Sequence, residues 1–204
     1  MNPTDPSPVS YILDFWFGSL DRDGRADKAH TSSWFKKDPD FDAAIVSNFS
    51  STYSLLTTGS RPSWASGADG LLSAILVLDQ FSRNMFRDRP EMYKFDDLAL
   101  RFSFEFIALG LDEGAPLAHR IFSYMPLMHS ERLIDQERCV TLFSRFADEL
   151  EGESAAVIQG NLKFAIAHRD IVARFGRFPH RNALLKRTST KEEVAFLNEP
   201  GSSF

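Results

Sequence analysis

Apolar side chains recur at three- and four-residue steps along most of this chain, and no long segment alternates with period two. Between residues 39 and 58, for example, Phe41, Ile45 and Phe49 keep this helical spacing. Glycine and proline fall between segments of helical length, where they punctuate the pattern. The 204 residues are therefore expected to form an all-α protein of roughly eight to ten helices, stacked as antiparallel hairpins.

Capping residues place several helix ends. Asp38 followed by Pro39 predicts a helix start, and Thr190 with Glu193 has the spacing of a capping box. Gly176 is expected to close a helix in the left-handed conformation. A loop is expected over 19–32. Helices are expected over 8–17, 68–84, 96–110, 130–151 and 154–175, and a further short helix is expected to stop at Pro126. Asp96 or Asp97 is expected to cap the helix over 96–110, and Ser130 the helix over 130–151.

Length and composition favour one domain over residues 1–204, and a disordered N-terminal segment is proposed over 1–7. No signal peptide is recognised, and the longest apolar run, residues 71–78, is too short to cross a bilayer. We therefore expect a cytoplasmic protein without a membrane partner. The net charge of −5 argues against nucleic acid. The single cysteine, Cys139, excludes an internal disulfide and is expected to be a core thiol.

Charged residues on apolar helix faces are the candidates for function, because burying a charge is costly unless the charge is paired. Asp79 continues the apolar stripe of the 68–84 segment, and Arg83 follows one turn later. These two residues form either a structural ion pair or a site in which Asp79 aims Arg83 at an anion, with Asn84 beside it.

Another candidate lies around Pro126. His129 is expected in a hinge between helices, with Ser130 as the cap and Glu131 in the first turn of the next helix. A capping role explains Ser130 and Glu131 but leaves His129 unexplained, and an imidazole suits proton transfer or ligand contact.

The helix over 154–175 places three polar residues, Asn161, His168 and Arg169, on its apolar faces. Directly after it, the stretch RFGRFPHRN gathers Arg174, Arg177, His180 and Arg181 within eight residues. Such side chains repel one another unless an anion lies among them, and Pro179 is expected to start a further helix there.

Two functions follow from these observations. In the first, the protein binds a small carboxylate or phosphate, and His129, assisted by Glu131 or His168, transfers a proton. The ligand-binding residues would then be Asp79, Arg83, Asn84, Arg169, Arg177, His180 and Arg181. In the second, the protein is an interaction module whose groove binds a peptide through Trp16, Trp34, Phe35 and Trp64.

No cofactor is expected, because nucleotide-binding and hydrolase motifs are absent. No metal is expected either, since the spacing of the residues that could ligate zinc matches no compact signature. These residues are His129, Glu131, His168 and His180. Whether the chain catalyses a reaction is left open.

Seven motifs in order give the chain a resemblance to the bacterial family called domain of unknown function 924. The resemblance extends from about Tyr11 to the C-terminus. Ser82 and Met128 depart from it, since proline and glutamate are expected there. The resemblance implies an all-helical, tetratricopeptide-like fold and no particular activity. The motifs are ILDFWFG, WFKKDPDFD, ILVLDQFSRNMFR, YMPLMHSE, DQERCV, RFGRFPHRN and FLNEPGSSF.

Overall fold

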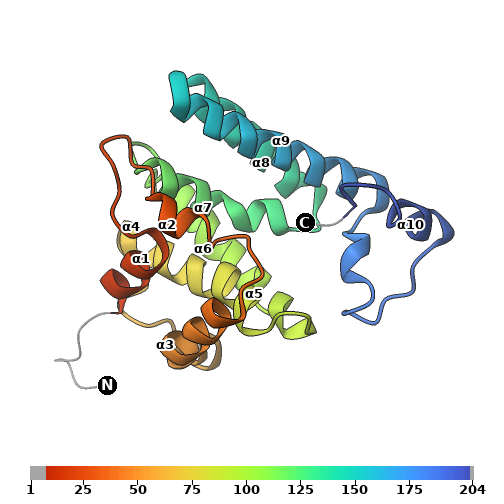
Figure 1. Ribbon diagram of the computed structural model, residues 1–204, viewed down its shortest axis with the longest axis horizontal. Helices are drawn as coiled ribbons and strands as arrows, with labels where there is room; N and C mark the ends of the chain where they lie inside the picture. Colours follow the sequence, from red (N-terminus) through yellow and green to blue (C-terminus); the bar gives the residue numbers. More distant parts are fainter. Residues whose placement is uncertain (1–7, 203–204) are drawn as a thin grey trace. The chain divides into compact units, whose positions relative to one another are not determined.

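The computed structural model describes residues 8–202, and its regular elements over that range are helices (Figure 1), which confirms the predicted all-α class. The chain divides into two compact units. The first comprises residues 91–126 and those up to 87, and the second comprises residues 88–90 and those from 127 on. The single-domain organisation stays a prediction, and the proposed disorder of residues 1–7 lies outside the described residues.

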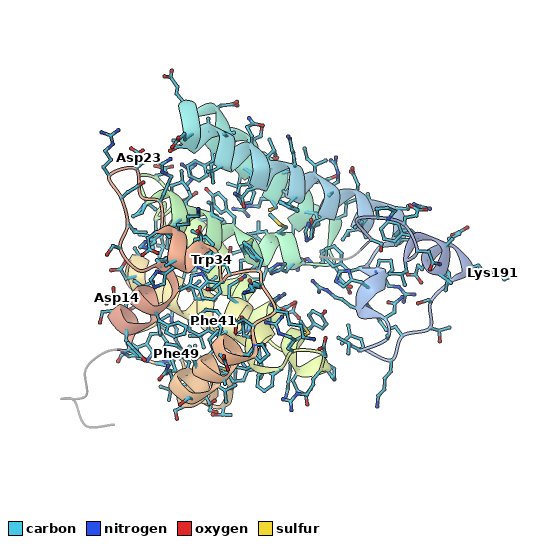
Figure 2. The ribbon with its side chains drawn as sticks, viewed as in Figure 1. Asp14, Asp23, Trp34, Phe41, Phe49 and Lys191 are labelled. Atoms are coloured by element: carbon cyan, nitrogen blue, oxygen red, sulfur yellow. The ribbon has the colours of Figure 1, made fainter. Side chains whose placement is uncertain are left out.

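The first unit is built around a buried central segment. Helix α4 and the π-helix η1 that continues it pack against α1, α3 and α6, and side chains such as Phe49 fill the space between the helices (Figure 2). No helix within residues 8–202 is both long and apolar enough to cross a membrane. The elements are α1 (Val9–Phe17), α2 (Lys28–Thr31), α3 (Pro39–Thr58), α4 (Gly67–Ile75), η1 (Leu76–Phe81), α5 (Ser82–Met85), the 3₁₀ turn η2 (Pro90–Tyr93, which begins in the second unit), α6 (Asp96–Ala108) and α7 (Leu117–His129, whose last residues belong to the second unit).

Two helix ends in this unit lie where they are expected, the start after Asp38 and the end at Phe17. Asp38 accepts hydrogen bonds from the backbone N–H groups of Asp40 and Phe41, with Pro39 as the first residue of α3. Gly18 ends α1 with φ +60°, a conformation that other residues rarely adopt. The predicted loop over 19–32 is wrong in part, because Asp27 caps the short helix α2 within it.

The helix predicted over 68–84 is interrupted by a six-residue π-helical segment. All residues of η1, including Asp79 and Gln80, are buried. A π-helical turn is rare and occurs often at functional sites, since it shifts the side chains that follow relative to an α-helix. The segment thus fixes the directions of the polar side chains that follow it.

Two boundary predictions in this unit are wrong. Asp96 is the first helical residue of α6 and makes no cap bond, because its carboxylate contacts Arg83 instead. Helix α7 continues through Pro126 to His129. Proline removes one backbone N–H from the helix, and the burial of Leu127 and Met128 supports the residues beyond it.

The second unit is an antiparallel hairpin followed by shorter elements (Figure 1). Helices α8 (Leu133–Asp148) and α9 (Gly152–Phe175) pack along each other, followed by the 3₁₀ turn η3 (Pro179–Arg181) and α10 (Lys191–Phe196). Cys139 is fully buried, as predicted. Gly176 closes α9 at φ 70°, Pro179 begins η3, and the capping box of Thr190 and Glu193 is present.

The predicted start of α8 is wrong by three residues. The helix begins at Leu133, while Ser130 donates a hydrogen bond to Asp135 at 2.7 Å and accepts one from the backbone of Arg132. His129 is the last residue of α7 rather than part of a hinge. Glu131 lies between the two helices, outside the first turn of α8. Its carboxylate contacts Arg187, which is far from it in the sequence.

Candidate functional site

Asp79 and Arg83 form a buried ion pair within the first unit. Asp79 is fully buried, and its Oδ1 lies 3.3 Å from Nη1 of Arg83. The guanidinium also contacts both carboxylate oxygens of Asp96 at 3.1 Å. Two carboxylates thus face one guanidinium, which leaves no excess positive charge to attract an anion. These contacts favour the structural interpretation of this pair.

Asn84 takes part in a neighbouring network that joins α5 to α3. Its amide donates to Oδ1 of Asp42 at 2.8 Å, and Arg87 forms a forked ion pair with the same carboxylate at 2.7 Å. A forked pair fixes orientation as well as charge. Asn84, like Asp79 and Arg83, therefore holds helices of the first unit together.

Arg177 of the RFGRFPHRN stretch is bound by a carboxylate that follows sixteen positions later in the sequence. Its Nε and Nη2 lie 2.6 and 2.8 Å from the two oxygens of Glu193. Glu193 also accepts from Asn182 and from the backbone of Thr190. These hydrogen bonds, chiefly those from Arg177, lower the pKa of Glu193 to about 2. The predicted ligand contact of Arg177 is thus occupied by a side chain of the protein.

Glu131 has a similar role for Arg187. The two side chains form a forked pair at 2.6 and 2.9 Å, and Glu131 accepts from the backbone N–H of Phe178 at 2.8 Å. Burial raises the pKa of Glu131, but the bonds from Arg187 and Phe178 outweigh burial and hold the pKa below its usual value. An ionised, fully engaged carboxylate is poorly suited to transfer protons.

The structure brings four of the predicted residues together around the ring of Phe178, and we call them the histidine–arginine cluster: His129, His168, His180 and Arg181. The rings of His168 and His180 lie 5.5 and 5.6 Å from that of Phe178. The guanidinium of Arg181 lies over the same ring at 4.5 Å and donates to the carbonyl of His129 at 2.9 Å. His129 completes the group, 6.4 Å from His168.

Burial keeps two of these imidazoles uncharged. Burial lowers the pKa of His168 to about 3, and the nearby His129 adds to this effect. Burial and the charge of Arg181 lower the pKa of His180 to about 4. His168 and Arg181 are buried, whereas His129 and His180 are partly exposed. Access to the cluster is therefore from the side of His129 and His180.

These lowered pKa values predict acid-sensitive stability of the second unit. Between pH 6.5 and about 4, the unfolded chain binds protons that the folded histidines do not bind, so stability falls with falling pH. The free energy of unfolding therefore changes by up to about 1.4 kcal/mol per pH unit for each histidine.

We expect His168→Phe to reduce this pH dependence by the contribution of one histidine. The measurement is the free energy of unfolding in urea between pH 5 and 7. Cys139→Ala, buried in the same unit, should lower stability without changing the slope. An unchanged slope in His168→Phe would contradict the prediction.

Three predicted polar residues of α9 have local partners outside this cluster. Arg169 contacts the neighbouring Asp170 at 2.6 Å, and Asn161 donates to the carbonyl of Val157. Arg174 stacks on the ring of Phe175. Arg174 also lies over the ring of Phe196 in α10. All three residues thus have partners within the protein.

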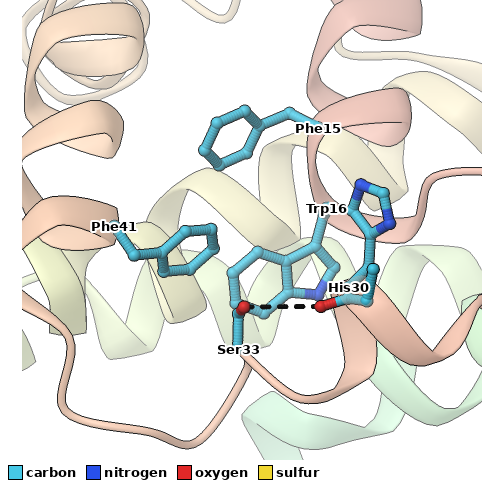
Figure 3. A pocket seen from close by; sticks show the side chains of 6 residues that line it. Phe15, Trp16, His30, Ser33 and Phe41 are labelled. Carbon is cyan, nitrogen blue, oxygen red and sulfur yellow. Dashed lines mark hydrogen bonds between the residues drawn. The ribbon is translucent and has the colours of Figure 1, made fainter.

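Sequence reasoning missed a pocket in the first unit, which is lined in part by Trp16 and His30 (Figure 3). The predicted role of Trp16 as an exposed groove residue is wrong, because the side chain is buried. Phe35 is 72% exposed, and the peptide-binding alternative stays a prediction. The signal that could have indicated the pocket is Asp27, three residues before His30, within the segment predicted as a loop.

Residues 8–202 contain no group of three or more His, Cys, Asp or Glu side chains placed to hold a metal ion.

Fold and contacts together define an all-helical protein whose second unit carries a partly buried histidine–arginine cluster. The chain belongs to the family described as bacterial protein of unknown function (DUF924), which matches residues 12–201. It is also similar to the solved structure of a protein of unknown function, ATU0120, from Agrobacterium tumefaciens. That likeness has a TM-score of 0.77 and 36% identity, and covers 93% of this chain and 96% of the other. Comparison with curated proteins gives no match.

Proposed function

We propose that the histidine–arginine cluster of the second unit binds a small anion, a carboxylate or a phosphate. The observation that carries this proposal is the grouping of basic side chains around one ring. The guanidinium of Arg181 lies over Phe178 at 4.5 Å, and the rings of His168 and His180 lie 5.5 and 5.6 Å from the same ring. A guanidinium with imidazoles beside it offers the donors that carboxylate and phosphate groups accept.

The rigid placement of the cluster supports the proposal further. Arg181 is held by Phe178 and by the carbonyl of His129, so its orientation is fixed before any ligand arrives. A guanidinium that is oriented in advance loses little entropy on binding, and it suits the geometry of carboxylate and phosphate. The partly exposed His129 and His180 can donate hydrogen bonds to the same anion after taking up a proton.

Binding is favoured over acid–base catalysis. A histidine with a pKa of about 3, as for His168, is a weak base at neutral pH. Glu131 is engaged by Arg187 and Phe178. Of the three residues considered for proton transfer, two are thus poorly suited to it.

The proposal predicts that inorganic phosphate raises the pKa of His180. An anion beside the imidazole favours the charged form, so the pKa of about 4 should rise by at least about one unit at saturating phosphate. The measurement is a pH titration of the histidine ring protons by NMR, with sodium chloride at equal ionic strength as the reference.

Two variants test the location of the site. Arg181→Gln removes the central guanidinium and should weaken phosphate binding by at least about 10-fold. Arg169→Gln removes an arginine of α9 that contacts Asp170, and should leave binding unchanged. Equal phosphate affinity in the wild type and in Arg181→Gln, or a pKa that responds to chloride as it does to phosphate, would overturn the proposal. Acetate in place of phosphate distinguishes a carboxylate site from a phosphate site.

A further inference from the structure

The first unit contains a pocket of about 270 Å³ whose walls are mostly aromatic (Figure 3). The rings of Phe15 and Phe41 stack at 5.5 Å, and Trp16 lies beside them. A cavity of about 150 Å³ lined by apolar side chains holds a benzene molecule. This pocket is larger, so it has room for one substituted ring or two fused rings. Its lining residues are Phe15, Trp16, Ala29, His30, Ser33 and Phe41.

One wall carries a histidine whose orientation is fixed by a carboxylate. Nδ1 of His30 lies 2.8 and 2.9 Å from the two oxygens of Asp27. The hydrogen bond from His30 also lowers the pKa of Asp27 and keeps it ionised. The backbone leaves space for this pair only because residue 18 is glycine. A Cβ there would lie 2.4 Å from Cε1 of His30 and 2.5 Å from Oδ2 of Asp27.

This pairing determines the chemistry of the other ring nitrogen. An ionised carboxylate only accepts hydrogen bonds, so Nδ1 of His30 carries the hydrogen. In the neutral imidazole, Nε2 is then an acceptor. Nε2 makes no hydrogen bond with any other residue of the described range. The pocket therefore offers an oriented acceptor beside aromatic walls.

A buried donor lies at the same pocket. The indole N–H of Trp16 has no acceptor within residues 8–202, although the residue is only 1% exposed. Figure 3 shows the indole nitrogen turned toward the segment of His30 and Ser33. A buried donor without an acceptor is costly, and such groups occur at functional sites.

We propose that this pocket binds a neutral aromatic molecule of one or two rings whose N–H or O–H group donates a hydrogen bond to Nε2 of His30. The aromatic walls of Phe15, Trp16 and Phe41 would stack against the ring of the ligand. Asp27 holds the acceptor in place, so the hydrogen bond selects molecules with a donor over those without one. The site belongs to the first unit and does not depend on the anion site of the second.

The test compares indole with 1-methylindole, which has the same rings but no donor. We expect indole to bind about 10-fold more tightly, the effect of one hydrogen bond to an oriented acceptor. Binding is measured by calorimetry at pH 8 on the full chain. The side-chain N–H signal of Trp16 in ¹⁵N-labelled protein reports whether the probe occupies this pocket.

Three variants locate the interaction. Ala29→Phe places a ring in the lining and should weaken both probes by at least about 10-fold, whereas Lys28→Phe adds the same ring at an exposed position of α2 that does not line the pocket. His30→Phe should bind the two probes equally. The proposal is overturned if neither probe shifts the Trp16 signal, if the wild type binds both equally, or if Ala29→Phe binds indole as the wild type does.

Discussion

Replacing Asp79 by alanine is expected to lower the free energy of unfolding of the first unit by about 2–3 kcal/mol. Asp79 is fully buried in the π-helix η1, and it contacts Arg83, which Asp96 also contacts. Its removal leaves a largely buried guanidinium with one carboxylate in place of two, and Gln80 loses its acceptor as well. Urea unfolding followed by tryptophan fluorescence measures this unit selectively, because all three tryptophans lie in it.

Two controls separate this effect from a general loss of charge. Asp69→Ala removes an exposed carboxylate from the first turn of α4 and should change stability by less than about 0.5 kcal/mol. The double variant Asp79→Leu with Arg83→Leu should lose less than the sum of its single variants, because the pair is removed as a unit. Strict additivity would show that the two charges do not interact.

Replacing Glu131 by glutamine is expected to destabilise the second unit by about 2 kcal/mol. The amide keeps the shape of the side chain but loses the charge that binds Arg187 and the strong acceptor for the N–H of Phe178. The pair is about one quarter exposed, so the effect is smaller than for a fully buried pair. The measurement is urea unfolding followed by circular dichroism, with tryptophan fluorescence reporting separately on the first unit.

The matched control is Glu137→Gln, an exposed glutamate of α8. It should leave both signals within about 0.5 kcal/mol of the wild type. If Glu131→Gln were equally neutral, the ion pair with Arg187 would contribute nothing. Glu131 would then again be a candidate for the proton-transfer role considered from the sequence.

Helix ends were predictable where a short-range cap decides them. Asp38 with Pro39, Thr190 with Glu193, and Gly176 act within four residues, and the structure has all three. Predictions failed where a distant partner competes with the local signal. Asp96 contacts Arg83 instead of capping α6, and Pro126 lies within a helix that continues beyond it.

In the candidate site, too, features set by neighbours in the sequence were predictable and those set by distant partners were not. The basic residues of RFGRFPHRN are close in sequence, so their proximity was predictable. Their carboxylate partners are distant: Glu193 follows Arg177 by sixteen positions, and Glu131 precedes Arg187 by fifty-six. Helical periodicity says which face a side chain occupies, but it does not say which remote charge meets it. The pocket at His30 was missed for a related reason, since its walls come from α1, α2 and α3 together.

The two long-range ion pairs of the second unit also bear on the order of events during synthesis. Arg177 and Arg187 are made after Glu131, but Arg177 has to wait for Glu193, which lies in α10. The residues of the first unit end at 126, so all of them are made before either arginine of these pairs. The guanidinium of Arg177 has its carboxylate partner only after residue 193 has left the ribosome. A chain that stalls before that point would expose a basic segment whose partner had not yet been made.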